Sequence, residues 1–171
     1  MGCDGYVWKY LRRDLGERRL LHWHFRGHGR TPLPRDPARI AIADLADDLA
    51  AVLDDSGTGP SVLFGHSMGV QVALEAYRRH PERVRALVLL CGAPENPLRT
   101  FRGQRGAEVV LPRIRAAVAR APRLINQAAR LMLPTRLAYS VAARLEVNAE
   151  LLQMSDFMPY LRGLSRVEVP F

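Results

Sequence analysis

Apolar residues recur every three or four positions in three stretches of the first half of the chain. Residues 6–15, 42–53 and 70–77 show this spacing, which predicts amphipathic helices. The apolar face of the second stretch is formed by Ile42, Leu45, Leu49, Val52 and Leu53. Its aspartates, Asp44, Asp47 and Asp48, are expected to point to solvent. The third stretch should stop at His80-Pro81, because the residue before a proline disfavours the helical conformation.

Short apolar runs between these stretches predict strands. They cover residues 20–25, 61–64 and 84–91, and the last run is almost continuously apolar, as in a parallel strand buried on both faces. Glycine-rich turns follow the first and the last run. Strand and helix therefore alternate over residues 19–91, which predicts a mostly parallel sheet and the α/β fold class.

The second half of the chain has a different pattern. Residues 95–166 show no convincing strand and are rich in Ala, Arg and Leu at helical spacing, with prolines at intervals. We expect three to five short helices here, packed as a cap. The predicted organisation is a partial core over residues 1–94, a helical cap or lid over residues 95–166, and a last segment, residues 167–171, that starts the return to the core.

Composition limits the classes of function. The 171 residues suffice for one domain, and 48% of them are hydrophobic, which argues against global disorder. The formal net charge of +8 would suit an acidic partner, but the basic residues are almost all dispersed arginines, which is typical of solvated helix faces, so we expect no nucleic-acid partner. No secretory signal and no membrane span is recognisable, which makes a cytoplasmic protein the expectation; the oligomeric state stays open. Cys91, one of two cysteines, is expected to be reduced and buried.

The chemistry of the chain is concentrated in the pentapeptide Gly65-His66-Ser67-Met68-Gly69. It follows an apolar run and precedes a helical pattern, which is the strand, turn and helix order of a nucleophile elbow. The strained turn requires small neighbours, and Gly65 and Gly69 meet that need. Ser67 is the candidate nucleophile, and the backbone N–H of Met68, at the helix start, is the candidate oxyanion-hole donor.

A general base for Ser67 is harder to find. His66 adjoins Ser67, but side chains of neighbouring residues at a tight turn diverge, and His80 is expected to be exposed at a helix end. His28, in a loop at the same edge of the sheet, could approach the pocket, although local hydrogen bonding is the favoured interpretation. Asp156, in the cap, is expected to be a solvated carboxylate.

Three histidines also allow a metal-site hypothesis. His22 and His24 share one face of the predicted strand and form an H-x-H-x-x-x-H pattern with His28, which would suit a zinc-activated water. Arg26 lies within the pattern and no acidic ligand is beside it. Local hydrogen bonding is therefore favoured, and no metal is predicted.

Several ordered motifs resemble the α/β-hydrolase superfamily. Residues 24–31, His-Phe-Arg-Gly-His-Gly-Arg-Thr, are similar to its D-x-R-G-x-G-x-S segment, with His24 in place of Asp and Thr31 in place of Ser. Residues 65–69 resemble its elbow, and residues 80–89 resemble the helix end and strand that follow. The resemblance implies a serine hydrolase with a helical cap, no cofactor, and a small ester-like acyl substrate such as a carboxylic ester or lactone.

Apolar cap residues fit such a substrate, although simple packing within the cap explains them equally well. They are Leu131, Met132, Leu133, Leu151, Leu152, Met154, Phe157 and Met158.

The resemblance also implies parts that this sequence does not show. The family's first strands, with a His-Gly oxyanion motif, would precede Met1, and its acid and histidine would follow Phe171. We therefore expect an internal piece of a longer hydrolase, truncated at both ends, with little or no turnover and marginal stability. The alternatives are a non-catalytic pseudo-hydrolase that binds a ligand or partner, and a basic protein that binds nucleic acid or an anionic membrane surface.

Overall fold

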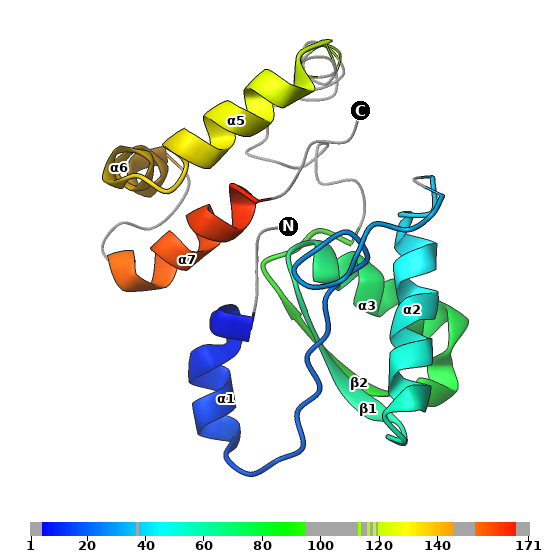
Figure 1. Cartoon of the computed structure of the whole chain (residues 1–171). Helices are drawn as coiled ribbons and strands as arrows, with labels where there is room; N and C mark the ends of the chain where they lie inside the picture. Colours follow the sequence, from blue (N-terminus) through cyan, green and yellow to red (C-terminus); the bar gives the residue numbers. More distant parts are fainter. Residues whose placement is uncertain are drawn as a thin grey trace. The chain divides into compact units, whose positions relative to one another are not determined.

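A computed structural model describes residues 5–36, 38–94, 113, 116, 118, 120–145 and 153–166 (Figure 1). They form two compact units. The sheet unit contains residues 25–27 and the described part of 32–112; the helical unit contains the described parts of 1–24, 28–31 and 113–171. The predicted division at residues 94 and 166 stays a prediction, and its last segment, residues 167–171, lies outside the described residues.

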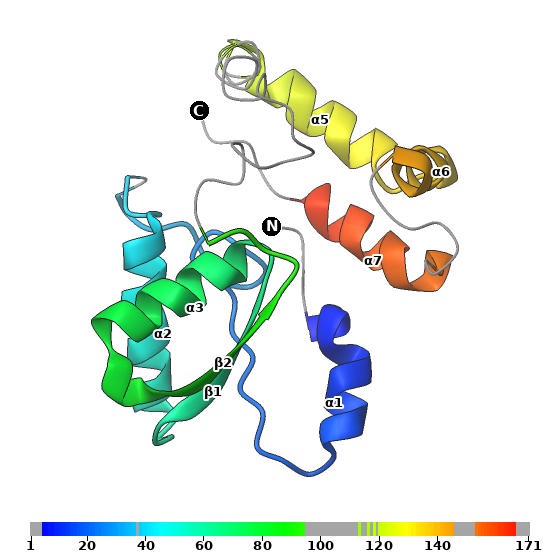
Figure 2. The same cartoon turned by 180° about the vertical axis from the view of Figure 1, so that it is seen from behind.

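The sheet unit is a strand–helix–strand arrangement. Strand β1 (Ser61–His66) and strand β2 (Val84–Leu90) run parallel, with Leu63 opposite Leu87 and Gly65 opposite Leu89. Helix α3 (Met68–Arg79) and the short 3-10 helix η2 (Pro81–Arg83) connect them. Helix α3 packs on both strands and helix α2 (Ile42–Asp55) packs on α3, as Figures 1 and 2 show from opposite sides. This arrangement confirms the predicted α/β class.

The core of this unit lies between the two helices and one face of the sheet. Its side chains are small or aliphatic and come from the apolar periods read in the sequence: Leu45, Ala46, Leu49 and Leu53 of α2, Leu63 of β1, and Val70, Val72, Ala73 and Ala76 of α3. Burial alternates along β1, because successive strand residues point to opposite faces. Val62 and Phe64 therefore remain exposed on the face away from α3.

The aspartates of α2 were predicted to point to solvent, but each of them accepts hydrogen bonds from the protein. Asp44 accepts a hydrogen bond from the N–H of Ala41 and caps the start of α2. Asp48 accepts two hydrogen bonds from Arg26, at 2.7 Å to Nε and 2.5 Å to Nη2. Asp47 binds Arg79 at the end of α3. Ion pairing of this kind was not visible in the sequence, since it depends on which helix packs alongside.

The predicted strand at residues 20–25 was wrong. The structure has no regular secondary structure there, and among the described residues the sheet consists of β1 and β2. An apolar, extended segment becomes a strand only when a neighbour completes its hydrogen-bond ladder. Strand β2 is also less buried than its composition predicted, because Leu89 and Leu90 are exposed.

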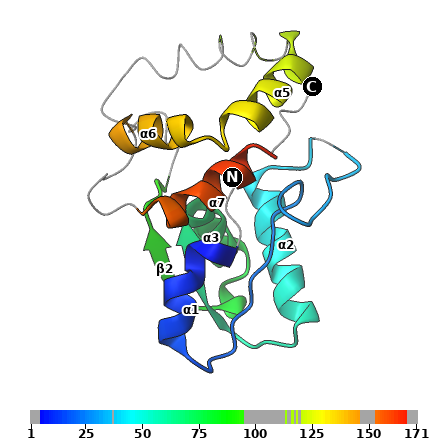
Figure 3. The same ribbon diagram turned by 60° about the vertical axis from the view of Figure 1, so that its left-hand side comes forward.

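The helical unit is built from short helices. The 3-10 helix η1 (Gly5–Trp8) continues into α1 (Lys9–Leu15), as the apolar spacing predicted. The predicted helical second half contains α5 (Pro122–Met132), α6 (Arg136–Leu145) and α7 (Met154–Leu164), while residues 95–112 and 146–152 lie outside the described residues. Helix α7 packs against α6 and against η1 (Figure 3).

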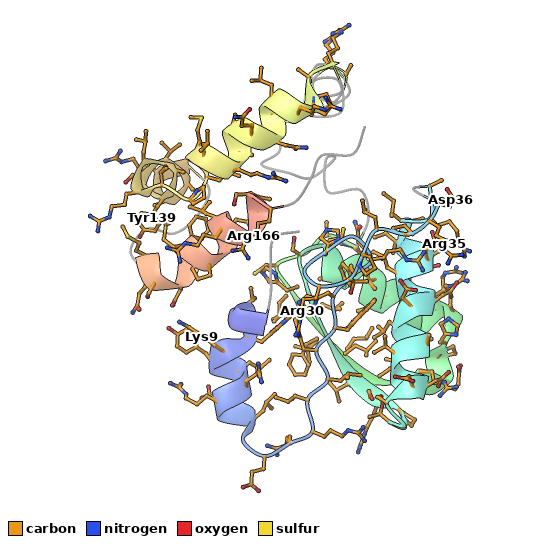
Figure 4. All side chains as sticks on the ribbon, viewed as in Figure 1. Lys9, Arg30, Arg35, Asp36, Tyr139 and Arg166 are labelled. Carbon is orange, nitrogen blue, oxygen red and sulfur yellow. The ribbon has the colours of Figure 1, made fainter. Side chains whose placement is uncertain are left out.

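Two contacts hold α7 in the helical unit. Asp156 accepts hydrogen bonds from Lys9 and from the Tyr10 hydroxyl, the latter at 2.8 Å, so it is not the solvated carboxylate that was predicted. The Lys9 ammonium and the Tyr10 hydroxyl lower the pKa of Asp156. The ring of Phe157 lies 6.2 Å from that of Tyr139 and 5.2 Å from that of Tyr160, which favours packing as its role; Lys9 and Tyr139 are labelled in Figure 4.

Candidate functional site

Ser67 lies in a sharp turn between β1 and α3. Its backbone has φ 55° and ψ −121°, a conformation that residues other than glycine rarely adopt. The turn is held from both sides, because the N–H of Ser67 donates to the carbonyl of Leu90 at 3.0 Å and the N–H of Val70 donates to the carbonyl of Ser67 at 3.0 Å. The end of β2 and the first turn of α3 thus fix this backbone.

The hydroxyl of Ser67 is available for chemistry. Ser67 occupies the N-cap position of α3, where a serine side chain usually accepts a hydrogen bond from the helix N–H groups. Here the side chain makes no capping hydrogen bond, and the residue is exposed. An exposed serine that does not cap the helix after it is what a nucleophile at this turn requires.

The two glycines of the pentapeptide differ in their surroundings. A Cβ on Gly65 would lie 2.5 Å from the carbonyl oxygen of Gly69, so only glycine fits there. A Cβ on Gly69 would meet no atom within 4 Å, so the prediction that Gly69 must be small for lack of space was wrong. The constraint falls on Gly92 instead, where a Cβ would lie 2.4 Å from the carbonyl oxygen of Ser67.

Gly92 is therefore a site residue that sequence analysis missed. It was identified only as part of the turn after β2, and its distance from the pentapeptide in the sequence concealed their contact. The available signal was the parallel pairing itself, because parallel strands bring their carboxyl ends to the same edge of a sheet.

Met68 is the first residue of α3. Its N–H belongs to the group of helix-start donors that have no carbonyl partner within the helix, and the helix dipole adds partial positive charge there. A negatively charged oxygen near Ser67 would be stabilised by these features. The role of Met68 as oxyanion donor stays a prediction.

The histidines differ in their access to this turn. His66 ends β1 and is half-buried, and burial lowers the pKa of its imidazole, which favours the neutral form that can accept a proton. His80 lies at the opposite end of α3, about 20 Å along the helix axis from Ser67 at 1.5 Å per residue. It is also engaged with Asp47 at 2.9 Å and only partly exposed. His80 is thereby excluded as a base within this unit, whereas His28 belongs to the helical unit.

The metal-site hypothesis gains no support from the geometry. The rings of His22 and His24 meet edge to face, with centroids 5.0 Å apart. In the part of the chain that the structure describes, no group of three His, Cys, Asp or Glu side chains is arranged to hold a metal ion. Arg26, within the same sequence pattern, is bound to Asp48 and to the carbonyl of Arg39. The hydroxyl of Thr31 donates to the carbonyl of His24 at 3.0 Å, which links the two ends of residues 24–31.

Cys91 was predicted to be buried, which was wrong. It is an exposed free thiol with φ 50°. Strand β2 ends at Leu90, so Cys91 belongs to the turn that follows, where its side chain is no longer covered by α3.

Comparison with known proteins identifies the family. Residues 4–155 match the family described as alpha/beta hydrolase fold. The chain belongs to this family, as its ordered motifs indicated. No solved structure is significantly similar to it.

Curated relatives include enzymes of ester and acyl chemistry. The chain is 38% identical over 106 residues to lipase LipV of Mycobacterium tuberculosis, covering 62% of this chain and 38% of the lipase. It is 35% identical over 94 residues to pimeloyl-[acyl-carrier protein] methyl ester esterase of Methylococcus capsulatus, covering 54% and 34%. It is 41% identical over 63 residues to homoserine O-acetyltransferase of Thermus thermophilus, covering 37% and 17%. The aligned part thus spans at most about two fifths of each of these relatives.

Proposed function

We propose that this chain carries the nucleophile of an ester hydrolase, with Ser67 attacking the carbonyl carbon of a small carboxylic ester, lactone or related acyl compound. The observation that carries the proposal is the position of Ser67 between β1 and α3. Its backbone has φ 55°, the residue is exposed, and its side chain does not cap the helix that it precedes. Two relatives named as a lipase and a methyl ester esterase favour an ester as the substrate.

The proposed reaction has two steps. Ser67 Oγ bonds to the carbonyl carbon, its proton passes to a base, and the Met68 N–H stabilises the oxyanion of the tetrahedral intermediate. The carbonyl re-forms as the alcohol leaves with a proton, which gives an acyl-serine. Water then attacks the acyl-serine and releases the acid. No cofactor is required.

Weak turnover is part of the proposal. Efficient serine catalysis needs a base that is itself held by an acid behind it. His80 is too distant within its unit, and His66 is adjacent in the sequence, where consecutive side chains diverge. We therefore expect that Ser67 reacts with strong acylating agents but hydrolyses esters slowly.

The experiment measures both properties with a matched control. Purified chain is tested for p-nitrophenyl acetate hydrolysis and for labelling by a fluorophosphonate probe. Ser67→Ala should abolish labelling, a loss of at least roughly tenfold, because the variant lacks the oxygen that the probe phosphonylates. Ser61→Ala removes a hydroxyl that donates to the carbonyl of Gly59 at the start of the same strand and should leave labelling unchanged.

Three outcomes would change the conclusion. Labelling that persists in Ser67→Ala would reject Ser67 as the nucleophile. No labelling of the unmodified chain would favour the alternative of a non-catalytic pseudo-hydrolase or binding fragment. Rapid ester turnover that Ser67→Ala abolishes would instead show that the chain supplies a base of its own.

A further inference from the structure

Helix α5 exposes an apolar ridge. Leu124, Ala128 and Leu131 are spaced by four and three residues, so they lie along one side of the helix. Leu124 is 67% exposed and Leu131 is 70% exposed, and Met132, at the end of the helix, is 64% exposed. Ile125 and Ala129, on another side, are partly covered. Both leucines and the methionine of α5 are thus exposed, which is more apolar exposure than packing for stability alone requires.

Arginines border this ridge. Arg123 and Arg130 directly precede the two leucines and are exposed, so the cationic column runs beside the apolar one. The following helix, α6, repeats the combination: Leu137 is 71% exposed and Val141 is exposed one turn later. Arg136 and Arg144 are exposed on the same helix. Figure 4 shows the side chains of α5 and α6 as sticks.

Within residues 109–145, which include α5 and α6, the charged residues have one sign. Arginines are dispersed along the whole chain, but acidic residues are not, because residues 109–145 contain no Asp or Glu. Seven arginines lie in that stretch: Arg113, Arg115, Arg120, Arg123, Arg130, Arg136 and Arg144. The segment therefore carries a formal charge of +7, from seven Arg minus zero Asp and Glu, out of the +8 of the whole chain.

We propose that α5, together with α6, binds the surface of an anionic lipid bilayer. A helix with a strong apolar side, an arginine-bordered polar side and low overall hydrophobicity is suited to lie in the membrane interface, where leucines enter the acyl boundary and cations meet lipid phosphates. A second copy of the chain would bring like charges together, and a nucleic acid would leave the leucines uncovered. No helix among the described residues is long and apolar enough to cross a bilayer.

The test is co-sedimentation of the full chain with vesicles. Phosphatidylcholine vesicles with and without phosphatidylglycerol are compared at low and moderate salt. Binding should require phosphatidylglycerol and should fall with salt, because the Debye length shortens. Arg123→Gln/Arg130→Gln and, separately, Leu124→Gln/Leu131→Gln should each weaken binding roughly tenfold, since both the charge and the apolar contact contribute.

Matched controls make the same chemical changes on the sheet unit. Arg35→Gln/Arg85→Gln removes two exposed charges, and Leu33→Gln/Tyr77→Gln removes two exposed apolar side chains; both should bind like the parent chain. Glutamine is a good helix former, and far-UV circular dichroism of the α5 variants checks that helicity is retained.

Four results would overturn the proposal. They are equal binding to vesicles without phosphatidylglycerol, equal losses in the control pairs, and binding that survives in the leucine variant. Duplex DNA that competes fully with the vesicles would also reject it, because nucleic acid would then be the partner. Ester turnover is not measured, so the result is independent of the role of Ser67.

Discussion

Gly65 and Gly69 flank Ser67 symmetrically in the sequence but not in space. At Gly65 an added methyl group would meet backbone atoms of Gly69, which cannot rotate away. Gly65→Ala should therefore shift the turn and destabilise the chain by about 1–3 kcal/mol. Gly69 lies inside α3 with open space around it, and Gly69→Ala should be neutral or stabilise the chain by up to about 1 kcal/mol.

Urea unfolding monitored by circular dichroism checks this pair. Fluorophosphonate labelling gives a second measurement, since displacement of the turn in Gly65→Ala should also lower the reactivity of Ser67. Equal destabilisation by the two substitutions would contradict the described turn. It would favour instead the sequence-based view, in which the two glycines serve the same purpose.

At the scale of elements, α2 and α3 are joined by Asp47. Its carboxylate accepts hydrogen bonds from Arg79 Nε at 2.8 Å and Nη2 at 2.7 Å, and contacts His80 Nε2 at 2.9 Å. Arg79 first and His80 second lower the pKa of Asp47 to about 2. The folded state therefore favours the ionised carboxylate of Asp47. The stabilisation that this pairing gives is complete above about pH 4 and disappears as the pH falls to about 2.

The substitution Asp47→Asn should remove this dependence of the stability on pH. The difference in unfolding free energy between the parent chain and Asp47→Asn should shrink by at most about 1 kcal/mol from pH 5 to pH 2, because the carboxylate is 45% exposed and solvent screens it. Chemical unfolding at several pH values measures it. Asp14→Asn, in a surface pair with its neighbour Arg13, is the control and should show a smaller change. A constant difference for Asp47→Asn would refute the pairing.

The sequence predicted most elements of the sheet unit because their periods were unambiguous. Helix α2 spans Ile42–Asp55 and buries Leu45, Leu49 and Leu53 of the predicted face, and β1 and α3 flank Ser67 in the predicted order. Three of the failures share one physical cause. Residues 20–25, the ion pairs of α2 and the close approach of Gly92 all depend on which segment lies opposite, and apolar spacing carries no information about that.

At the scale of the whole molecule, association between copies depends on apolar side chains that stay exposed on one face of the small sheet. Helix α3 covers one side of β1 and β2, whereas Val62 is 45% exposed and Phe64 36% exposed on the other, and Leu90 of β2 is 38% exposed. Register places Val62 beside Ala86 and Phe64 beside Val88, and Leu90 follows Val88 on the same face, so apolar side chains are neighbours there. Contiguous exposed apolar surface on a sheet promotes association between molecules.

We therefore expect the isolated chain to self-associate as its concentration rises, and charged residues on this face to suppress it. Val62→Lys/Leu90→Lys should reduce light scattering and retard elution toward the monomer volume, because lysine side chains repel an approaching copy. Both replaced side chains are well exposed, so the free energy of unfolding should fall by no more than about 1 kcal/mol. Leu33→Lys/Tyr77→Lys adds the same charge at exposed apolar sites away from this face. If this control suppresses association equally, net charge is responsible and the sheet face is not.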